Sequence, residues 1–369
     1  MNITANIMVK NEESKIVRCI ESVIKFADEV VVVDTGSSDN TISLLKELVR
    51  KFGPEKIVLL SHKWENDFSV IRNYMIENSN GRFILQIDAD EFLESSPKLE
   101  EKKDDIIKML EKEYSTILCP IIKNTNGSTY RTIPRLFRND KHYYFAGNIH
   151  EELRNTRYRN LKSVSIDLMI HHDGYEKDAI VGKDKLVRNV KLLKYVIEKE
   201  PNNFRWRFFW IRENYYAGTN KEEIIRDAEK FIQDIGNRAE YMLVYIILAL
   251  CYIETNRYEK VCDIVLFLKE NGCAMDASFI ELTLVLCEIR EQSVVVNRII
   301  KDICSIENCN SQLNENGEHV RVQLFKTLFS LGRYKEAFCV LEEVDYYTKK
   351  DAVIPELIEI RKNIDIILS

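Results

Sequence analysis

The sequence predicts an α/β domain with a mainly parallel sheet, followed by a domain made of helices alone. Short apolar runs of strand type alternate with helical patterns in the first part of the chain, which is typical of a parallel sheet covered by helices. Beyond about residue 180 the strand signals fade and long helical patterns take over. The length of 369 residues exceeds one average domain. We therefore expect two domains, residues 1–180 and 181–369.

The elements of the first domain follow from their apolar patterns. Ile3–Val9 is an apolar run that predicts a buried strand, and Ile16 to Ile24 then repeat at helical spacing. Further strands are predicted at residues 29–34, 57–60, 83–87 and 168–170, with helical stretches from residue 42 and around residues 72–76. No G-x-G-x-x-G follows the first strand, which argues against a standard dinucleotide-binding fold.

Two carboxylates follow the strand predicted at residues 83–87. Asp88 and Asp90 are two residues apart, so both side chains can face one crevice at the carboxyl end of the sheet, where open α/β sheets bind ligands. Carboxylates so placed suit Mg²⁺ or Mn²⁺ held against a diphosphate. The alternative is a solvated acidic turn.

Several stretches of the first 175 residues resemble family 2 glycosyltransferases of the GT-A fold. The general motifs are 9–13, 33–41 and 88–91. Four further segments resemble a bacterial subgroup of this family, in which tetratricopeptide-type (TPR) helices follow the catalytic domain. These segments are residues 64–69, Arg72-Asn73, 147–152 and 172–175. That subgroup includes the peptide S-glycosyltransferases of glycosylated bacteriocins, the sublancin type, and borders the sugar transferases of cell-surface polysaccharides. Some bacteriocin enzymes carry a helical N-terminal extension, which is not expected here because the first strand starts at residue 3.

The resemblance implies a donor site for a UDP-sugar, with UDP-glucose as the first choice. Its residues would be Asn11 and Glu12 on the uracil side, Asp34 at the base, Arg72 at the phosphates and Asp88 at the ribose or metal. Asp34 has an alternative role as the cap of the turn at residues 35–38, and Arg72 could equally be a surface arginine.

The metal and the reacting atoms form the other half of the predicted site. Asp90, Asp88 and His172 would bind Mg²⁺ or Mn²⁺; His172 is preferred to His171 because it matches the family pattern and only one of two adjacent strand residues faces the site. A structural histidine is the alternative. Glu151, with His150 orienting it, is the expected base of an inverting transfer to a peptide cysteine or serine; which of the two is the base stays open, and the pair could instead only shape its loop.

The second half of the sequence carries a recurring connection between helical stretches. It is found at residues 216–222, 253–259, 289–293 and 331–337, a spacing close to the ~34 residues of a TPR unit. Stacked helical hairpins present a long surface. We expect either a peptide cradle, a homodimer contact or a stabilising appendage.

Composition restricts the function classes. The net charge of −6 gives no electrostatic case for nucleic acid or an anionic membrane. Nine cysteines without regular spacing indicate reduced thiols, and Cys251, Cys262, Cys287 and Cys339 are expected in helix cores. No apolar run reaches the ~18 residues of a membrane span; the longest, 241–253, predicts a buried helix. These features favour an intracellular enzyme, and the resemblance implies a cytoplasmic bacterial one. The alternatives are a polysaccharide or lipopolysaccharide sugar transferase and a non-catalytic interaction protein.

Overall fold

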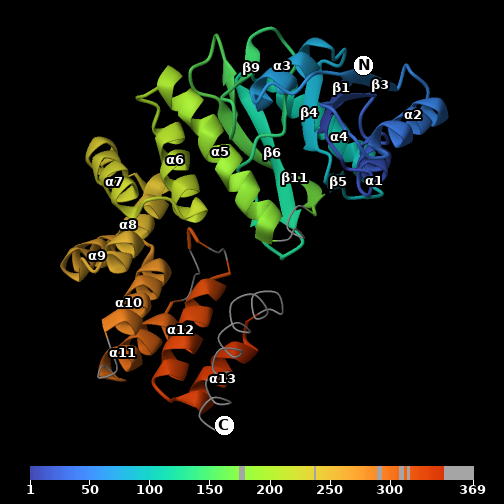
Figure 1. Cartoon of the computed structure of the whole chain (residues 1–369). Coiled ribbons are helices and arrows are strands. Elements are labelled where there is room, and N and C mark those ends of the chain that lie inside the picture. Colours follow the sequence, from blue (N-terminus) through green and yellow to red (C-terminus); the bar gives the residue numbers. More distant parts are fainter. Residues whose placement is uncertain (174–178, 237, 289–292, 307–310, 314–315, 345–369) are drawn as a thin grey trace. The chain divides into compact units, whose positions relative to one another are not determined.

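A computed structural model of the chain describes residues 1–173, 179–236, 238–288, 293–306, 311–313 and 316–344 (Figure 1). The chain separates into two compact units, Met1–Glu200 and Pro201–Ser369. The first is α/β and the second all-helical, which confirms the predicted fold class. Helix α5 (Ala179–Lys199), which crosses the predicted boundary at residue 180, belongs to the first unit.

The first unit is built on one large mixed sheet with the strand order β3-β2-β1-β4-β8-β6-β11-β5, and β7 pairs with β6. Strands β3, β2, β1 and β4 are parallel, as predicted, whereas β8 lies antiparallel between β4 and β6. A separate hairpin pairs β9 with β10. The strands are β1 Ile3–Val9, β2 Glu29–Asp34, β3 Ile57–Ser61, β4 Phe83–Asp88, β5 Glu91–Leu93, β6 Thr116–Asn124, β7 Thr129–Tyr130, β8 Leu136–Arg138, β9 Tyr143–Ala146, β10 Glu152–Asn155 and β11 Lys162–His172.

Strand β5, at one end of the sheet order, is linked by a short turn to β4 in the middle of the sheet. Only Ala89 and Asp90 separate β4 from β5 along the chain, yet three strands lie between them in the sheet order. Strand β5 pairs antiparallel with β11, with Ile170 opposite Leu93 and His172 opposite Glu91. The turn that carries Asp90 is therefore tied to the end of β11.

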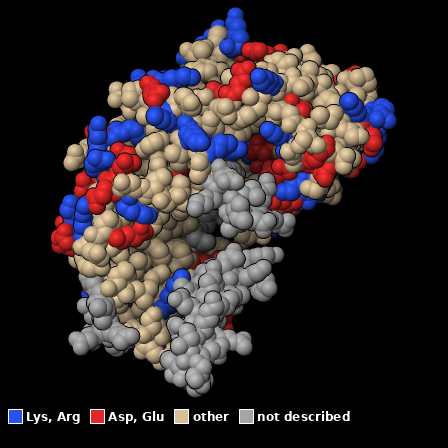
Figure 2. Space-filling view, viewed as in Figure 1, with Lys and Arg blue, Asp and Glu red and all other residues tan. Residues whose placement is uncertain are grey.

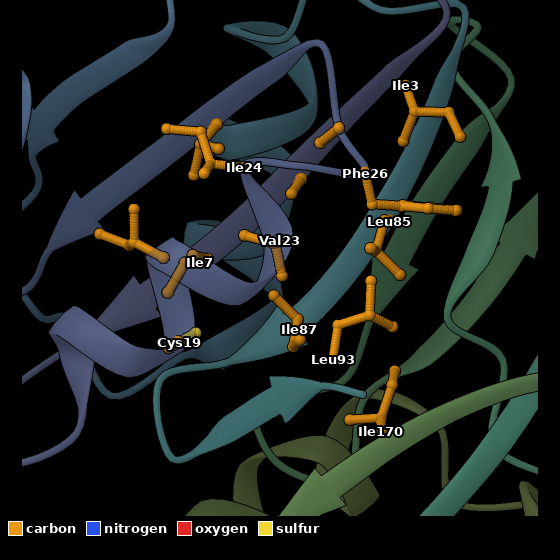
Figure 3. Packing of buried hydrophobic residues seen from close by; sticks show 14 of the residues in the cluster. Ile3, Ile7, Cys19, Val23, Ile24, Phe26, Leu85, Ile87, Leu93 and Ile170 are labelled. Atoms are coloured by element: carbon orange, nitrogen blue, oxygen red, sulfur yellow. The ribbon is translucent and has the colours of Figure 1, made fainter. Parts of the chain in front are cut away.

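Apolar packing holds these strands together beneath the turn. Figure 3 shows Ile87 of β4, Leu93 of β5 and Ile170 of β11 beside Val23 of α1, and all four side chains are buried. Each residue comes from a different element, so burial of one apolar cluster fixes the ends of three strands at once. The helices of this unit are α1 Ile16–Val23, α2 Thr41–Phe52, α3 Phe68–Glu77, α4 Leu99–Lys112 and α5.

Gly81, just before β4, lies against the first strand. A Cβ atom added to Gly81 would sit 2.6 Å from the backbone nitrogen of Thr4, so backbone would have to move. We expect Gly81→Ala to lower the free energy of unfolding by about 1–3 kcal/mol, the usual cost of overpacking. Urea denaturation of the purified protein measures this difference. Unchanged stability would show that the backbone around Gly81 and Thr4 can move apart without cost.

The second unit consists of helical hairpins. Three predicted connections are confirmed: they join α6 to α7, α8 to α9 and α12 to α13. Each contains a residue with a left-handed backbone, Gly218, Asn256 or Gly332, a conformation that glycine and asparagine tolerate best. The fourth connection falls on residues 289–292, outside the described residues. The helices are α6 Phe204–Ala217, α7 Lys221–Ile235, α8 Met242–Glu254, α9 Val261–Glu270, α10 Ala274–Glu288, α11 Ser293–Cys304, α12 Glu318–Ser330 and α13 Tyr334–Glu342.

The most apolar segment is confirmed as a core helix: every residue of α8 from Met242 to Ile253 is buried. Cys251 lies within it, but Cys262, Cys287 and Cys339 are exposed, so core packing was the wrong prediction for these three. They lie on the outward faces of helices whose other sides carry the apolar contacts. No helix within the described residues is long and apolar enough to cross a membrane.

Charged side chains of both signs are interspersed on the face seen in Figure 2. This arrangement agrees with the small net charge of −6. Among the described residues that this face shows, there is no broad basic surface of the kind that binds a polyanion.

Candidate active site

The predicted donor residues gather at one edge of the sheet. Strand β1 lies between β2 and β4, with Val9 opposite Asp34 and Met8 opposite Asp88. The three strands are parallel, so their carboxyl ends meet at the same edge, where open α/β sheets bind ligands. The structure thus brings Asp34 and Asp88 to the two sides of β1, with Asn11 just beyond its end.

Asn11 and Asp34 organise the loop that follows β2. The side-chain oxygen of Asn11 accepts a hydrogen bond from Ser38 N at 2.7 Å, and its backbone N–H donates to Ser37 Oγ at 2.9 Å. Asp34 is buried and accepts from Gly36 N at 2.9 Å and from Ser37 N. Asp34 therefore caps the turn, as the alternative interpretation expected, and holds the loop in place.

Glu12 is linked to the same loop through its backbone. Its N–H donates to Thr41 Oγ1 at 2.9 Å, at the start of α2. Its carbonyl oxygen accepts from Ile16 N at the start of α1. Glu12 thus lies where two helices begin, at the edge of the sheet formed by the carboxyl ends of β1 and β2.

Asp90 and His172 come together across the β5–β11 ladder. His172 is opposite Glu91, and beyond the ladder Asp173 N donates to the Asp90 carbonyl oxygen at 3.1 Å. This register places His172 Nε2 3.5 Å from Asp90 Oδ2, while Asn124 Oδ1 lies 2.8 Å from His172 Nδ1. Burial disfavours both charged forms, but the mutual hydrogen bond prevails: it lowers the pKa of Asp90 and raises the pKa of His172.

The neighbouring histidine faces away from the Asp90 side chain. His171 stacks on Phe92 with ring centroids 4.9 Å apart, and its Nε2 lies 3.1 Å from Glu94 Oε1. Adjacent strand residues point to opposite faces. Of the two histidines, His172 is the one that lies beside Asp90.

Arg72, from helix α3, bridges the two halves of the predicted site. Its Nη2 donates to Asp88 Oδ1 at 3.2 Å, and its Nε donates to Glu151 Oε1. The side chain is largely buried, so it is not the surface arginine of the alternative interpretation. The first aspartate of the D-x-D and the predicted base therefore share one guanidinium.

Arg135 and Glu91 complete the charged cluster, and sequence reasoning missed both roles. Arg135 Nη2 donates to Asp88 Oδ2 at 2.9 Å and to Glu91 Oε1 at 2.6 Å. Burial opposes ionisation of Asp88, yet Arg135 and Arg72 outweigh it and hold the Asp88 pKa well below its usual value. Burial raises the pKa of Glu91, against the opposing charge of Arg135. The sequence signal was only an arginine before a short apolar run.

The segment that carries His150 and Glu151 is attached to α3. Asn73 Nδ2 donates to the Phe145 carbonyl oxygen at 2.9 Å, and Phe145 N donates to Asn73 Oδ1 at 2.7 Å. His150 has a left-handed backbone, with φ of 51°. This backbone conformation, uncommon for a residue other than glycine, turns the chain just before Glu151. The Arg72-Asn73 pair thus contacts both Glu151 and the segment leading to it.

We expect Asn73→Asp to loosen this attachment. Aspartate still accepts from Phe145 N but sets an oxygen against the Phe145 carbonyl, which costs about 1–3 kcal/mol for a buried unsatisfied group. Hydrogen exchange of the amides at 145–151 should become faster. Asn78→Asp is the matched control: Asn78 also donates to a carbonyl of α3, that of Tyr74, at 2.8 Å, so its loss should leave exchange at 145–151 unchanged. Equal exchange in both variants contradicts the role of Asn73.

A divalent cation fits two of the three predicted ligands. Within the described residues no three His, Cys, Asp or Glu side chains converge as a ready metal cage. Mg²⁺ commonly takes only one or two protein ligands and completes its shell with waters and substrate phosphates. Asp90 and His172, partly exposed and adjacent, fit that mode. Both carboxylate oxygens of Asp88 accept from arginines.

Comparison with known proteins gives matches to glycosyltransferases. Residues 4–172 match the family model "Glycosyl transferase family 2". The chain is 25% identical over 364 residues to the SPbeta prophage-derived glycosyltransferase SunS of Bacillus subtilis, covering 96% of this chain and 82% of SunS. It is 30% identical over 110 residues to the lipopolysaccharide core biosynthesis glycosyltransferase LpsC of Rhizobium meliloti, covering 28% of this chain and 39% of LpsC.

Among solved structures, S. aureus TarS 1-349 in complex with UDP-GlcNAc aligns with a TM-score of 0.41 and 16% identity, over 72% of this chain and 89% of that one. The family match spans every strand of the large sheet, from β1 to the end of β11. It also includes Asp88, Asp90, Glu151 and His172. Residues 4–172 thus form a domain of the glycosyl transferase family 2.

Proposed function

We propose that this protein moves a hexose from a UDP-sugar, UDP-glucose first among them, to a cysteine or serine side chain of a bacteriocin precursor peptide, with inversion at the anomeric carbon. The observation that carries the proposal is the Asp90–His172 pair, 3.5 Å apart, beside Asp88 at the carboxyl edge of the sheet. Such a pair suits a divalent cation whose remaining ligands are waters and substrate phosphates. The chain is similar to the glycosyltransferase SunS over 96% of its length, and a peptide acceptor is what the resemblance to bacteriocin S-glycosyltransferases implies.

The donor would lie across the ends of β1, β2 and β4. Asn11 and Asp34 fix the 35–41 loop, which would enclose the uracil, with Glu12 beside it. Asp88 would face the ribose. Its two arginine partners keep it ionised, and an ionised carboxylate accepts hydrogen bonds from sugar hydroxyls strongly.

Asp90 and His172 would hold the cation. When bound, Mg²⁺ or Mn²⁺ would neutralise the charge that develops on the departing diphosphate. His172 must be neutral to act as a ligand; Asn124 Oδ1, 2.8 Å from Nδ1, would orient its ring and leave Nε2 facing Asp90. Orientation of a ligand histidine by its second nitrogen is how proteins fix such rings.

Glu151 would act as the base on the acceptor side. The acceptor thiol or hydroxyl attacks the anomeric carbon as the bond to the UDP oxygen breaks, and its proton passes to Glu151. Arg72 engages Glu151 Oε1, so Oε2 is the oxygen left to accept the proton. A cysteine thiol, with an unperturbed pKa of about 8.5, needs less help than a hydroxyl. His150, just before Glu151, would orient the base or the acceptor.

Mass spectrometry of candidate peptides tests the proposal. The purified protein is incubated with UDP-glucose, Mg²⁺ and a Cys-containing bacteriocin precursor, and with the same peptide carrying Cys→Ser changes. A hexose added to the unmodified peptide supports peptide transfer, and the Ser peptide separates S- from O-linkage. If the peptide stays unmodified and UDP is released only when a lipopolysaccharide core acceptor is added, the LpsC-like alternative is favoured. Absence of both UDP-sugar binding and hydrolysis would identify a non-catalytic interaction protein.

The helical unit is proposed to present the peptide through TPR-like hairpins. A chain ending at Glu200, the last residue of the first compact unit, should still hydrolyse UDP-sugar but lose transfer to peptide. Retained transfer would contradict this role. If the unit instead forms a dimer, the full chain should elute at twice its mass of 43.4 kDa and the shortened chain as a monomer.

A further inference from the structure

Arg135 occupies an unusual position next to the D-x-D turn. Its backbone is held on both sides: its N–H donates to the Leu118 carbonyl at 3.0 Å, and its carbonyl accepts from Gln86 N at 2.7 Å. The side chain is 8% exposed. From this fixed origin in the interior, the guanidinium reaches outward to Asp88, whose side chain is about one-third exposed.

The contacts of Arg135 close a ring around the turn. Its Nη2 donates to Asp88 Oδ2 at 2.9 Å and to Glu91 Oε1 at 2.6 Å. The other oxygen of Glu91 accepts from the backbone N–H of Asp88 at 2.8 Å. Asp90 lies inside this ring along the chain. The ring therefore determines both the direction of the Asp88 carboxylate and the path of the turn that carries Asp90.

Stability alone is a poor explanation for such a ring. Burying an arginine and a glutamate costs several kcal/mol per ion, and well-packed apolar side chains often serve a fold equally well. What apolar side chains cannot do is aim a carboxylate. Arg135 itself has little exposed surface, and its Nη2 is already shared by two carboxylates, so it would act on a substrate through Asp88.

We propose that Arg135 is a positioning residue for the transferase reaction, which aims Asp88 at the donor and sets the turn of Asp90, with Glu91 as its counter-ion. This inference rests on the proposed function. It adds two residues, Arg135 and Glu91, to the site. It also explains why Glu91 follows the D-x-D directly: a carboxylate there can accept from Asp88 N and from Arg135 at once.

The test separates stability from positioning with four variants: Arg135→Met, Arg135→Lys, the double variant Arg135→Met/Glu91→Gln, and Arg138→Met. Arg135→Met leaves Glu91 buried without its cation and should unfold at a lower temperature. In the double variant the unpaired charge is gone, so the unfolding temperature should recover, while Asp88 still lacks its partner. Arg138→Met is the matched control: Arg138 is the last residue of β8, whereas Arg135 directly precedes that strand, and Arg138 donates to the Leu110 carbonyl, away from Asp88.

The readouts are the unfolding temperature, the affinity for UDP by calorimetry with Mn²⁺, and kcat and KM for UDP-glucose hydrolysis per folded molecule. We expect kcat of the double variant to stay roughly 10- to 100-fold below wild type, the usual loss when an outer-shell partner of a site is removed. Arg138→Met should lose stability but keep kcat. Arg135→Lys keeps the charge but not the shared geometry, and should lose kcat without a large loss of stability.

Recovery of wild-type kcat together with stability in the double variant would overturn the proposal, because Arg135 would then be only structural. If the double variant does not fold, Arg135→Lys replaces it as the test. A wild-type kcat of Arg135→Lys would then also overturn the proposal. A wild-type protein that neither binds UDP nor hydrolyses UDP-glucose contradicts the proposed function itself. That result is distinct, since it is seen before any variant is made.

Discussion

An Asp90→Asn variant is expected to lose sugar transfer while its fold stays intact. The change removes one charge from the side chain that pairs with His172 but leaves the volume almost unchanged. A cation at a diphosphate supplies several kcal/mol of transition-state stabilisation, so its loss should lower kcat by roughly 1000-fold or more. UDP release from UDP-glucose, with circular dichroism as the check on folding, measures both properties.

Chelation should reproduce the effect in the unchanged protein. EDTA should stop the reaction and added Mn²⁺ or Mg²⁺ should restore it. Asp167→Asn is the matched control, because Asp167 lies on the same strand as His172 but its side chain is exposed and pairs with Lys102. Full activity of Asp90→Asn in the presence of chelator would remove the cation from the proposed mechanism.

A Glu151→Gln variant should separate turnover from donor binding. Glutamine can still accept from Arg72 Nε through its amide oxygen, so the link to α3 survives. It cannot take up a proton, and loss of general base catalysis typically costs 10²–10⁴-fold in rate, roughly the loss expected here in kcat. The affinity for UDP-sugar should change little, because the proposed donor contacts lie at the ends of β1, β2 and β4.

Glu152→Gln serves as the control for this variant. Glu152 is the next residue, but its carboxylate pairs with Arg154 on β10 at 2.5 Å, so kcat should stay near wild type. If Glu151→Gln instead weakens UDP-sugar binding and leaves turnover intact, Glu151 is a donor-binding residue. His150 then becomes the first candidate for the base.

The first strands were predictable because each is buried on both faces. The predicted strands Ile3–Val9 and 29–34 match β1 and β2 in full. Every residue of β2 and nearly every residue of β1 is buried, so the apolar run in the sequence is almost unbroken. Strand β4 ends one residue later than predicted, at Asp88. Continuous apolar runs of this length are characteristic of parallel sheets between helices.

The middle of the chain was not predictable in the same way. Strand β11 extends over Lys162–His172, but only its end, 168–170, was predicted, because its first half alternates exposed and buried residues with charged side chains. Strands β5 and β8 have three residues each. Such short segments carry no period, and their antiparallel pairing depends on partners far away in sequence.

The site residues likewise fall into those that the sequence predicted and those that it did not. Asp88, Asp90 and His172 stand directly at strand ends, so their positions followed from local sequence. The role of Arg135 did not, because it depends on β8 inserting antiparallel between β4 and β6, which delivers the arginine to Asp88. Partners that meet only through strand pairing leave no local signal.

Strand β5 gains its partner only when β11 has been synthesised. A ribosome releases the two aspartates with β4, whereas the chain reaches Lys162, where β11 begins, much later. Closing so long a loop costs entropy that short-range contacts do not, so the sheet should close late in folding. Until then the nascent protein carries its acidic turn without the imidazole of His172 beside Asp90.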